Sequence, residues 1–107
     1  MYIDFDPARG YEIKQRRPAL VMSQDNYNRA THLVIVCPIT STTKRRPFLV
    51  PITTELLAKE SVVNTNQLFS LDYTEQAGRS PEVLGALDEE TFYQVAQNIL
   101  LNFNFPL

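Results

Sequence analysis

Two segments of the chain carry side chains that suit an anionic ligand. Residues 7–17, which we expect to form a loop, include the charged side chains of Glu12, Lys14, Arg16 and Arg17. Pro18 restrains the backbone of Arg17 to the extended region, which helps to aim its guanidinium. Because a guanidinium can bind two phosphate oxygens at once, this loop favours a phosphate ligand.

A second loop, expected at residues 40–47, is rich in hydroxyls and cations: Thr40, Ser41, Thr42, Thr43, Lys44, Arg45 and Arg46. Both loops leave a strand, so together they can flank one groove. Basic grooves with aromatic rings nearby are typical of single-stranded nucleic-acid binding, and Tyr11, Tyr27 and Phe69 are candidate stacking platforms. Without further information the pattern leaves an ordinary solvated polar surface open as the alternative.

The sequence lacks the residue patterns that metal sites and nucleotide-cofactor sites require. The chain has one histidine, His32, and one cysteine, Cys37, with no paired-ligand spacing, so we expect no metal site. It contains neither a Walker loop nor a GxGxxG motif, so we expect no nucleotide cofactor. His32 is expected in a turn or on the surface. Cys37 lies in an apolar run and is expected to be buried and inert, which together with the lack of a disulfide partner predicts a cytoplasmic protein.

Composition predicts one packed domain spanning residues 1–107. The chain is 44% hydrophobic and 21% charged, close to globular averages, and no apolar run approaches the roughly 20 residues that cross a bilayer, so we expect no membrane partner. Its net charge of −2 is uneven. Residues 1–50 hold eight cations against four anions, whereas residues 51–107 hold two cations against eight anions. This asymmetry favours a localised anion site.

The elements that must position these residues are mostly strands. Apolar and β-branched runs predict strands at residues 1–5, 19–22, 33–39, 48–52, 82–85 and, once or twice, within 61–71. Pro47 and Pro51 place the 48–52 strand at a sheet edge. A helical turn is expected at 25–30. A C-terminal helix capped by Asp88 carries an apolar stripe: Phe92, Val95, Ala96, Ile99 and Leu100.

The predicted fold class is therefore mainly β: a small, curled antiparallel sheet or partial barrel with one C-terminal helix. The tail beyond the helix alternates apolar and polar residues. We expect it to pack Phe103 and Phe105 against the domain or against a second subunit.

The order and spacing of several landmarks resemble the MazF/PemK/Kid family of toxin endoribonucleases. The landmarks are Asp4-Phe-Asp-Pro7, Gly10, Glu12, Arg16-Arg17-Pro-Ala-Leu-Val21, Tyr27-Asn28, Cys37-Pro-Ile-Thr40 and Pro47-Phe48. The resemblance implies an SH3-like antiparallel barrel shared with CcdB. It also implies a homodimer that cuts single-stranded RNA at short sequences without a metal or other cofactor, and an antitoxin partner whose disordered C-terminal segment binds the toxin.

The resemblance also implies roles for individual residues. Arg17 and Thr40 match the family's catalytic arginine and threonine, and Glu12 matches an acidic loop position. Asp72 falls where some members carry a site aspartate. We assign Arg17, Thr40 and Glu12 to catalysis, and we assign these residues to RNA binding: Lys14, Arg16, Thr42, Lys44, Arg45 and Asp72. Glu12 remains open between a catalytic base and a salt-bridge partner for Arg16 or Arg17.

The chain departs from the family pattern at two places. Phe69 replaces a residue that is commonly basic, and the chain begins inside the usual first strand, so we expect that strand to be shortened. The alternative function is a CcdB-like, non-enzymatic poison that binds DNA gyrase. A binding module without catalytic activity is a third possibility. The absence of tryptophan and the ending Phe105-Pro-Leu107 count against the gyrase poison.

Overall fold

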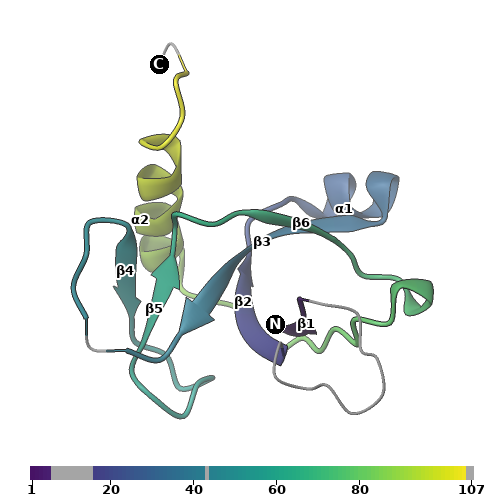
Figure 1. Cartoon of the computed structure of the whole chain (residues 1–107), viewed down its shortest axis with the longest axis horizontal. Helices are drawn as coiled ribbons and strands as arrows, with labels where there is room; N and C mark the ends of the chain where they lie inside the picture. The colour runs from purple at the N-terminus through teal and green to yellow at the C-terminus, as the bar shows by residue number, and fades with distance from the viewer. Residues whose placement is uncertain (6–15, 43, 106–107) are drawn as a thin grey trace.

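A computed structural model describes residues 1–5, 16–42 and 44–105 of the chain (Figure 1). These residues form a six-stranded antiparallel sheet with helices attached. The strands are β1 (Tyr2–Asp4), β2 (Arg16–Val21), β3 (Leu33–Thr40), β4 (Leu49–Ile52), β5 (Ser61–Asn64) and β6 (Phe69–Asp72). The helices are α1 (Asp25–Thr31), the short 3₁₀ helix η1 (Glu75–Ala77) and α2 (Glu89–Leu100). The predicted mainly β fold with a C-terminal helix is confirmed.

The long central strand β3 organises the sheet, as its β-branched run predicts. One edge of β3 pairs with β2, and β2 in turn pairs with β1. The other edge pairs first with β6, from Leu33 to Val36, and then with β5 at Ile39 and Thr40. Because one edge of β3 serves two strands in succession, the sheet curls around it (Figure 1). Strand β4, which contains Pro51 and follows Pro47, lies at the far edge, as predicted.

Alternate residues of the strands build a hydrophobic cluster on each face of the sheet. The cluster beneath α2 contains Cys37, Ile39, Val50, Ile52, Val63, Val95 and Ile99. The opposite cluster contains Ile3, Ala19, Val34, Val36 and Leu71. Burial raises the pKa of the Cys37 thiol to about 11, which keeps it protonated at neutral pH. The expectation of a buried cysteine is confirmed.

Helix α2 begins where the sequence predicts. The Asp88 carboxylate accepts hydrogen bonds from the backbone N–H of Thr91 at 3.0 Å and from its hydroxyl at 2.9 Å. These two bonds lower the pKa of Asp88 below its ordinary value. Val95 and Ile99 of the predicted stripe are buried, but Leu100 is exposed because the end of α2 and the tail extend away from the sheet (Figure 1).

Several predicted boundaries were wrong. Arg16 and Arg17 belong to β2 rather than to the preceding loop, because pairing with β1 continues the strand through them. Thr40 is the last residue of β3 and pairs with Val62. Residues 82–85 form no strand: Glu82 makes only an isolated bridge with Tyr2. His32 lies in the turn after α1, in a left-handed conformation (φ 59°), which confirms the turn expected for it.

Candidate active site

The sheet places Arg17 and Thr40 at one end, just beyond the last pair of β2 and β3. Strands β2 and β3 pair in antiparallel register through Val21–Val36, Leu20–Cys37 and Ala19–Pro38. Arg17 and Thr40 each lie two residues beyond the Ala19–Pro38 pair, on the sides of their strands that Ala19 and Pro38 occupy. Directly paired residues share a face of a sheet, so both side chains belong to the face that carries Ile3 and Ala19. Residues 23 positions apart in the chain thus meet at one end of the sheet.

Neighbouring strands hold the two residues from both sides. Arg17 pairs with Ile3 of β1, a fully buried residue, and Thr40 pairs with Val62 of β5, which is 1% exposed. The Arg17 side chain is itself exposed, and among the described residues its guanidinium has neither a hydrogen-bond nor an ion-pair partner. Thr40 is half-buried. A fixed backbone with an unpartnered guanidinium is suited to receive an external anion.

Arg16, next to Arg17 in the chain, points to the other face and is fully engaged. Its guanidinium donates to the Asp4 carboxylate at 3.3 Å, to the Ser80 carbonyl at 2.8 Å and to the Glu82 carboxylate at 3.4 Å. It also lies 5.9 Å from the centre of the Tyr2 ring. These contacts join β1, β2 and the segment 79–82, so the structure supports a structural role for Arg16 where the sequence predicts RNA binding.

Asp72 lies far from this pair. It pairs with Leu33 at the start of β3. Leu33 is seven residues from Thr40, a separation of about 23 Å along the strand. Its carboxylate accepts from the Thr74 hydroxyl at 2.6 Å and from the Thr74 backbone N–H at 2.8 Å, and these bonds lower its pKa. The structure therefore does not bring Asp72 to Arg17 and Thr40 within one chain.

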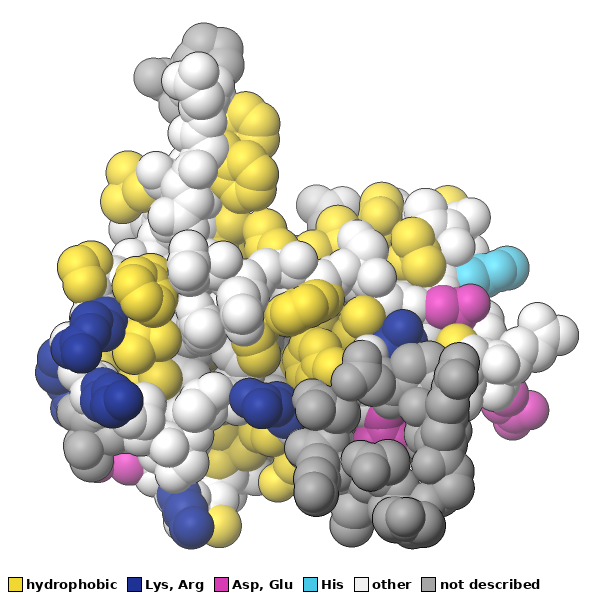
Figure 2. Space-filling view, viewed as in Figure 1, with side chains coloured by type: hydrophobic (Ala, Val, Ile, Leu, Met, Phe, Trp, Pro, Cys, Tyr) yellow, Lys and Arg dark blue, Asp and Glu magenta, His cyan; other side chains and the backbone are white. Residues whose placement is uncertain are grey.

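The loop that follows β3 carries the second group of predicted site residues. The Thr42 hydroxyl accepts from the backbone N–H of Lys44 at 3.1 Å, which forms a local turn. The side chains of Lys44, Arg45 and Arg46 are exposed. Figure 2 shows Lys and Arg side chains gathered over this loop at one edge of the molecule, with a further dark-blue group near the middle of the same face. The loop thus adds positive charge directly beyond Thr40.

Glu12 and Lys14, both predicted site residues, lie outside the described residues, as does the candidate stacking residue Tyr11. Within the described part of the chain, no group of three or more His, Cys, Asp or Glu residues could hold a metal ion. The helices of that same part include none that is long and apolar enough to cross a membrane.

The sequence analysis named Phe69 as a candidate stacking platform but did not predict its packing partner, and it missed a contact of Arg79. Phe69 faces Val36 on β6 and packs edge-on against Phe5, with 5.1 Å between ring centres, on the same face of the sheet as Arg17. Arg79 donates to the carbonyl oxygens of Asp4 (3.1 Å) and Phe5, at the end of β1. Arg79 is more than 70 residues from these carbonyls in the chain, so no local pattern could have indicated the contact.

Comparisons with known proteins give a consistent result. The family described as "PemK-like, MazF-like toxin of type II toxin-antitoxin system" matches residues 1–103. The chain is similar to Endoribonuclease MazF6 of Mycobacterium tuberculosis, with 36% identity over 95 residues, covering 83% of this chain and 82% of the relative.

Solved structures show the same relationship. The crystal structure of MazF from Deinococcus radiodurans is 33% identical with a TM-score of 0.74, covering 95% of this chain and 91% of that one. The crystal structure of the MazE–MazF complex from the same organism is 30% identical with a TM-score of 0.74, covering 96% and 90%.

Proposed function

Because the chain belongs to the PemK-like, MazF-like toxins of type II toxin–antitoxin systems, we propose that it is a sequence-specific endoribonuclease that cuts single-stranded RNA. The observation that carries the proposal is the placement of Arg17 and Thr40 at one end and on one face of the sheet, with an exposed Arg17 guanidinium that has no hydrogen-bond or ion-pair partner among the described residues. The name of the relative MazF6, an endoribonuclease, supports the same activity. We also propose that residues 1–107 form a single toxin domain. Because its proposed substrate is RNA, we propose that it acts in the cytoplasm.

The proposed chemistry is a metal-independent attack of a ribose 2′-hydroxyl on the adjacent phosphorus. The 2′-hydroxyl gives up its proton to a base as its oxygen bonds to phosphorus, which forms a 2′,3′-cyclic phosphate. The bond from phosphorus to the 5′-oxygen breaks, and that oxygen takes up a proton and leaves as a 5′-hydroxyl. Arg17 is permanently charged, so it stabilises the negative charge that develops on the phosphate oxygens. Thr40 donates a hydrogen bond to a phosphate oxygen or orients the attacking hydroxyl. Glu12 is the candidate base, and its alternative role is a salt-bridge partner for Arg16 or Arg17.

RNA would approach along the loop that follows β3. Thr42, Lys44 and Arg45 lie directly beyond Thr40 in the chain, and Lys14 belongs to the segment that precedes β2. Arg16 supports the site indirectly through its contacts with Asp4 and Ser80. Asp72 would contact only an RNA that extends along the length of β3.

Two protein partners are proposed. The MazE–MazF complex of the Deinococcus relative supports a cognate antitoxin, which would bind through a disordered segment. A homodimer is supported by the apolar end of α2 and the tail: Leu101 is 83% exposed, and the stacked rings of Phe103 and Phe105 are 46% and 53% exposed. Burying these side chains against a second copy would stabilise a dimer. Light scattering at tens of micromolar is the test, and a monomer mass would contradict the dimer.

Incubation of the pure protein with a long, unstructured RNA in EDTA tests the activity. We expect discrete fragments with 5′-hydroxyl ends, which polynucleotide kinase labels without prior phosphatase treatment. Cleavage that is lost in EDTA and restored by magnesium would contradict the proposed chemistry. An intact RNA under all conditions would leave a non-enzymatic poison, as in CcdB-like proteins, as the better explanation.

A further inference from the structure

A hollow opens next to the Arg17–Thr40 pair, on the other face of the sheet. Its walls include Pro18 and Ile39, which directly neighbour Arg17 and Thr40 in the chain, and its floor is formed by residues 57–59, ahead of β5. The cavity volume is about 260 Å³. Pockets for drug-sized ligands measure about 300–1,000 Å³, so this hollow suits a smaller group.

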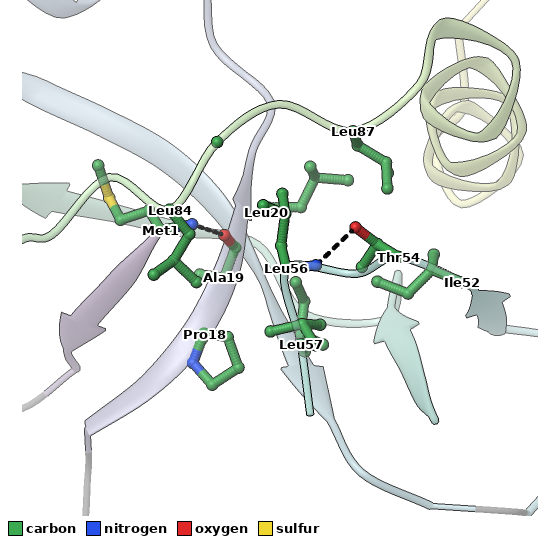
Figure 3. Close-up of a pocket in the computed structure, with 12 residues that line it drawn as sticks. Met1, Pro18, Ala19, Leu20, Ile52, Thr54, Leu56, Leu57, Leu84 and Leu87 are labelled. Carbon is green, nitrogen blue, oxygen red and sulfur yellow. Dashed lines mark hydrogen bonds between the residues drawn. The ribbon is translucent and has the colours of Figure 1, made fainter. Parts of the chain in front are cut away.

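The neighbouring hollow gives a useful contrast. Figure 3 shows it lined by apolar side chains from several segments, among them Leu20, Leu56 and Leu87. Its one hydroxyl, that of Thr54, accepts a hydrogen bond from the backbone N–H of Leu56 at 3.2 Å. This second hollow therefore offers a ligand no free polar side chain, and we interpret it as a packing gap in the hydrophobic core.

The hollow beside Arg17 and Thr40 offers an aromatic ring and several hydrogen-bonding groups. Tyr2, Ser41 and Lys59 line it together with the apolar walls. The guanidinium of Arg16 lies 5.9 Å from the centre of the Tyr2 ring, which helps to hold the ring in place. The turn that carries Lys59 is fixed by a hydrogen bond of 2.9 Å from the Ser61 hydroxyl to the Lys59 carbonyl. In the described part of the chain the Lys59 ammonium has no ion-pair partner.

Successive residues of a strand point to opposite faces, and their Cα atoms are about 3.8 Å apart. The hollow is therefore one residue away from the proposed cleavage site on both β2 and β3. Strand β2 starts at Arg16 and β3 ends at Thr40, so this is also the end of the sheet, where a flexible chain can pass from one face to the other. An RNA with a phosphate at Arg17 can turn a neighbouring base over this end.

We propose that this hollow binds one unstacked base of the RNA, next to the phosphate that is cut. The inference rests on the proposed ribonuclease function and adds a determinant of its sequence preference. Unpaired bases stack on aromatic side chains and are read through hydrogen bonds to their edges, which are the contacts that Tyr2, Ser41 and Lys59 provide. Because an ammonium only donates hydrogen bonds, Lys59 would contact the base at a carbonyl oxygen or a ring-nitrogen acceptor, and the position of that acceptor differs from base to base.

The test compares two matched substitutions at exposed alanines. Ala58→Trp fills this hollow, and Ala86→Trp places the same bulk in a separate hollow near Phe92, with a different lining. Both variants and the wild type are incubated with one long, unstructured RNA, and all 5′-hydroxyl ends are mapped by sequencing. For Ala58→Trp we expect cleavage at the wild-type sites to fall on the order of tenfold to a hundredfold, as when a base-stacking contact is removed. Ala86→Trp should match the wild type, because its hollow contains none of Tyr2, Ser41 and Lys59.

Lys59→Gln provides a second measurement that does not depend on the tryptophan variant folding. This variant should still cut the RNA, but it should show a weaker base preference at one position beside the cut and therefore also cut at other sites in the same RNA. If Ala58→Trp keeps its native circular dichroism and both it and Lys59→Gln give the wild-type rates and cleavage sites, the base-binding inference is overturned and the ribonuclease function stands. If the wild type itself cuts no RNA, both proposals fail.

Discussion

Arg16 and Asp4 form an ion pair of 3.3 Å that connects the start of β2 to the end of β1. The next residue along β2, Arg17, carries an exposed guanidinium without a partner among the described residues. Two consecutive arginines therefore have opposite surroundings, because strand alternation turns one to each face of the sheet. Arg16 stabilises the fold, and Arg17 remains available for a ligand.

Substitution of the two arginines should separate these roles. Arg16→Ala removes hydrogen bonds to Asp4, Ser80 and Glu82, and it should lower the free energy of unfolding by about 1–3 kcal/mol. Arg17→Ala removes no hydrogen bond or ion pair with a described residue, so its unfolding free energy should stay within about 0.5 kcal/mol of the wild type. Urea denaturation followed by circular dichroism measures both. Equal stabilities of the two variants would contradict the structural role of Arg16.

Substitutions of Arg17 and Thr40 should lower the rate of RNA cleavage while leaving the protein folded. Arg17→Ala and Thr40→Ala should each lower the rate of RNA cleavage by on the order of 10²–10³, because each removes a preorganised group from the transition state. Arg17→Lys should recover little of the loss, since an ammonium lacks the planar fork of a guanidinium. Initial rates on a short fluorescent RNA provide the measurement. Near wild-type rates from both folded alanine variants would place the catalytic site elsewhere.

Replacing Glu12 distinguishes the two roles left open for it. If Glu12 is the base, Glu12→Gln should slow cleavage and remove the loss of rate on the acidic side of the pH–rate profile. Asp25→Asn is the matched control, because Asp25 is an exposed carboxylate at the start of α1 that is not among the proposed site residues, and it should leave the profile unchanged. A Glu12→Gln variant with the wild-type profile and lower resistance to urea would instead identify Glu12 as an ion-pair partner.

The N-cap of α2 should give the protein an acid-sensitive element. Hydrogen bonds from the Thr91 backbone and hydroxyl lower the pKa of Asp88 below its ordinary value of 3.8. A lowered pKa in the folded state means that the carboxylate stabilises the fold above about pH 4 and loses this effect as the pH falls through its folded-state value. Asp88→Asn should therefore lose less of its stability between pH 5 and pH 2.5 than the wild type. Urea denaturation midpoints at several pH values would show this difference, and parallel curves would contradict it.

Local signals in the sequence were sufficient for some elements and not for others. Helix α2 could be predicted because its cap at Asp88 and its apolar period lie within a few residues of each other. The start of β2 could not, because Arg16 and Arg17 are polar and join the strand only through pairing with β1. The structural role of Arg16 depends on Ser80 and Glu82, which are 64 and 66 residues away in the chain. Arg17 and Thr40 were found from short motifs, but their placement at one end of the sheet depends on a strand register that the sequence does not specify.

The loop beyond Thr40 should make RNA binding sensitive to salt. The exposed ammonium of Lys44 can neutralise one phosphate, and each neutralised phosphate of a single strand contributes about −0.7 to the slope of log affinity against log salt concentration. Lys44→Ala, measured by fluorescence anisotropy in a Thr40→Ala background that prevents cleavage, should bind more weakly and lose about 0.7 of that slope. Arg29→Ala is the control. Arg29 is an exposed arginine on α1, outside the loop beyond Thr40, and it donates a hydrogen bond to Asn26 at 2.9 Å. Equal slopes for Lys44→Ala and the Arg29→Ala control would show that this loop does not contact the RNA backbone.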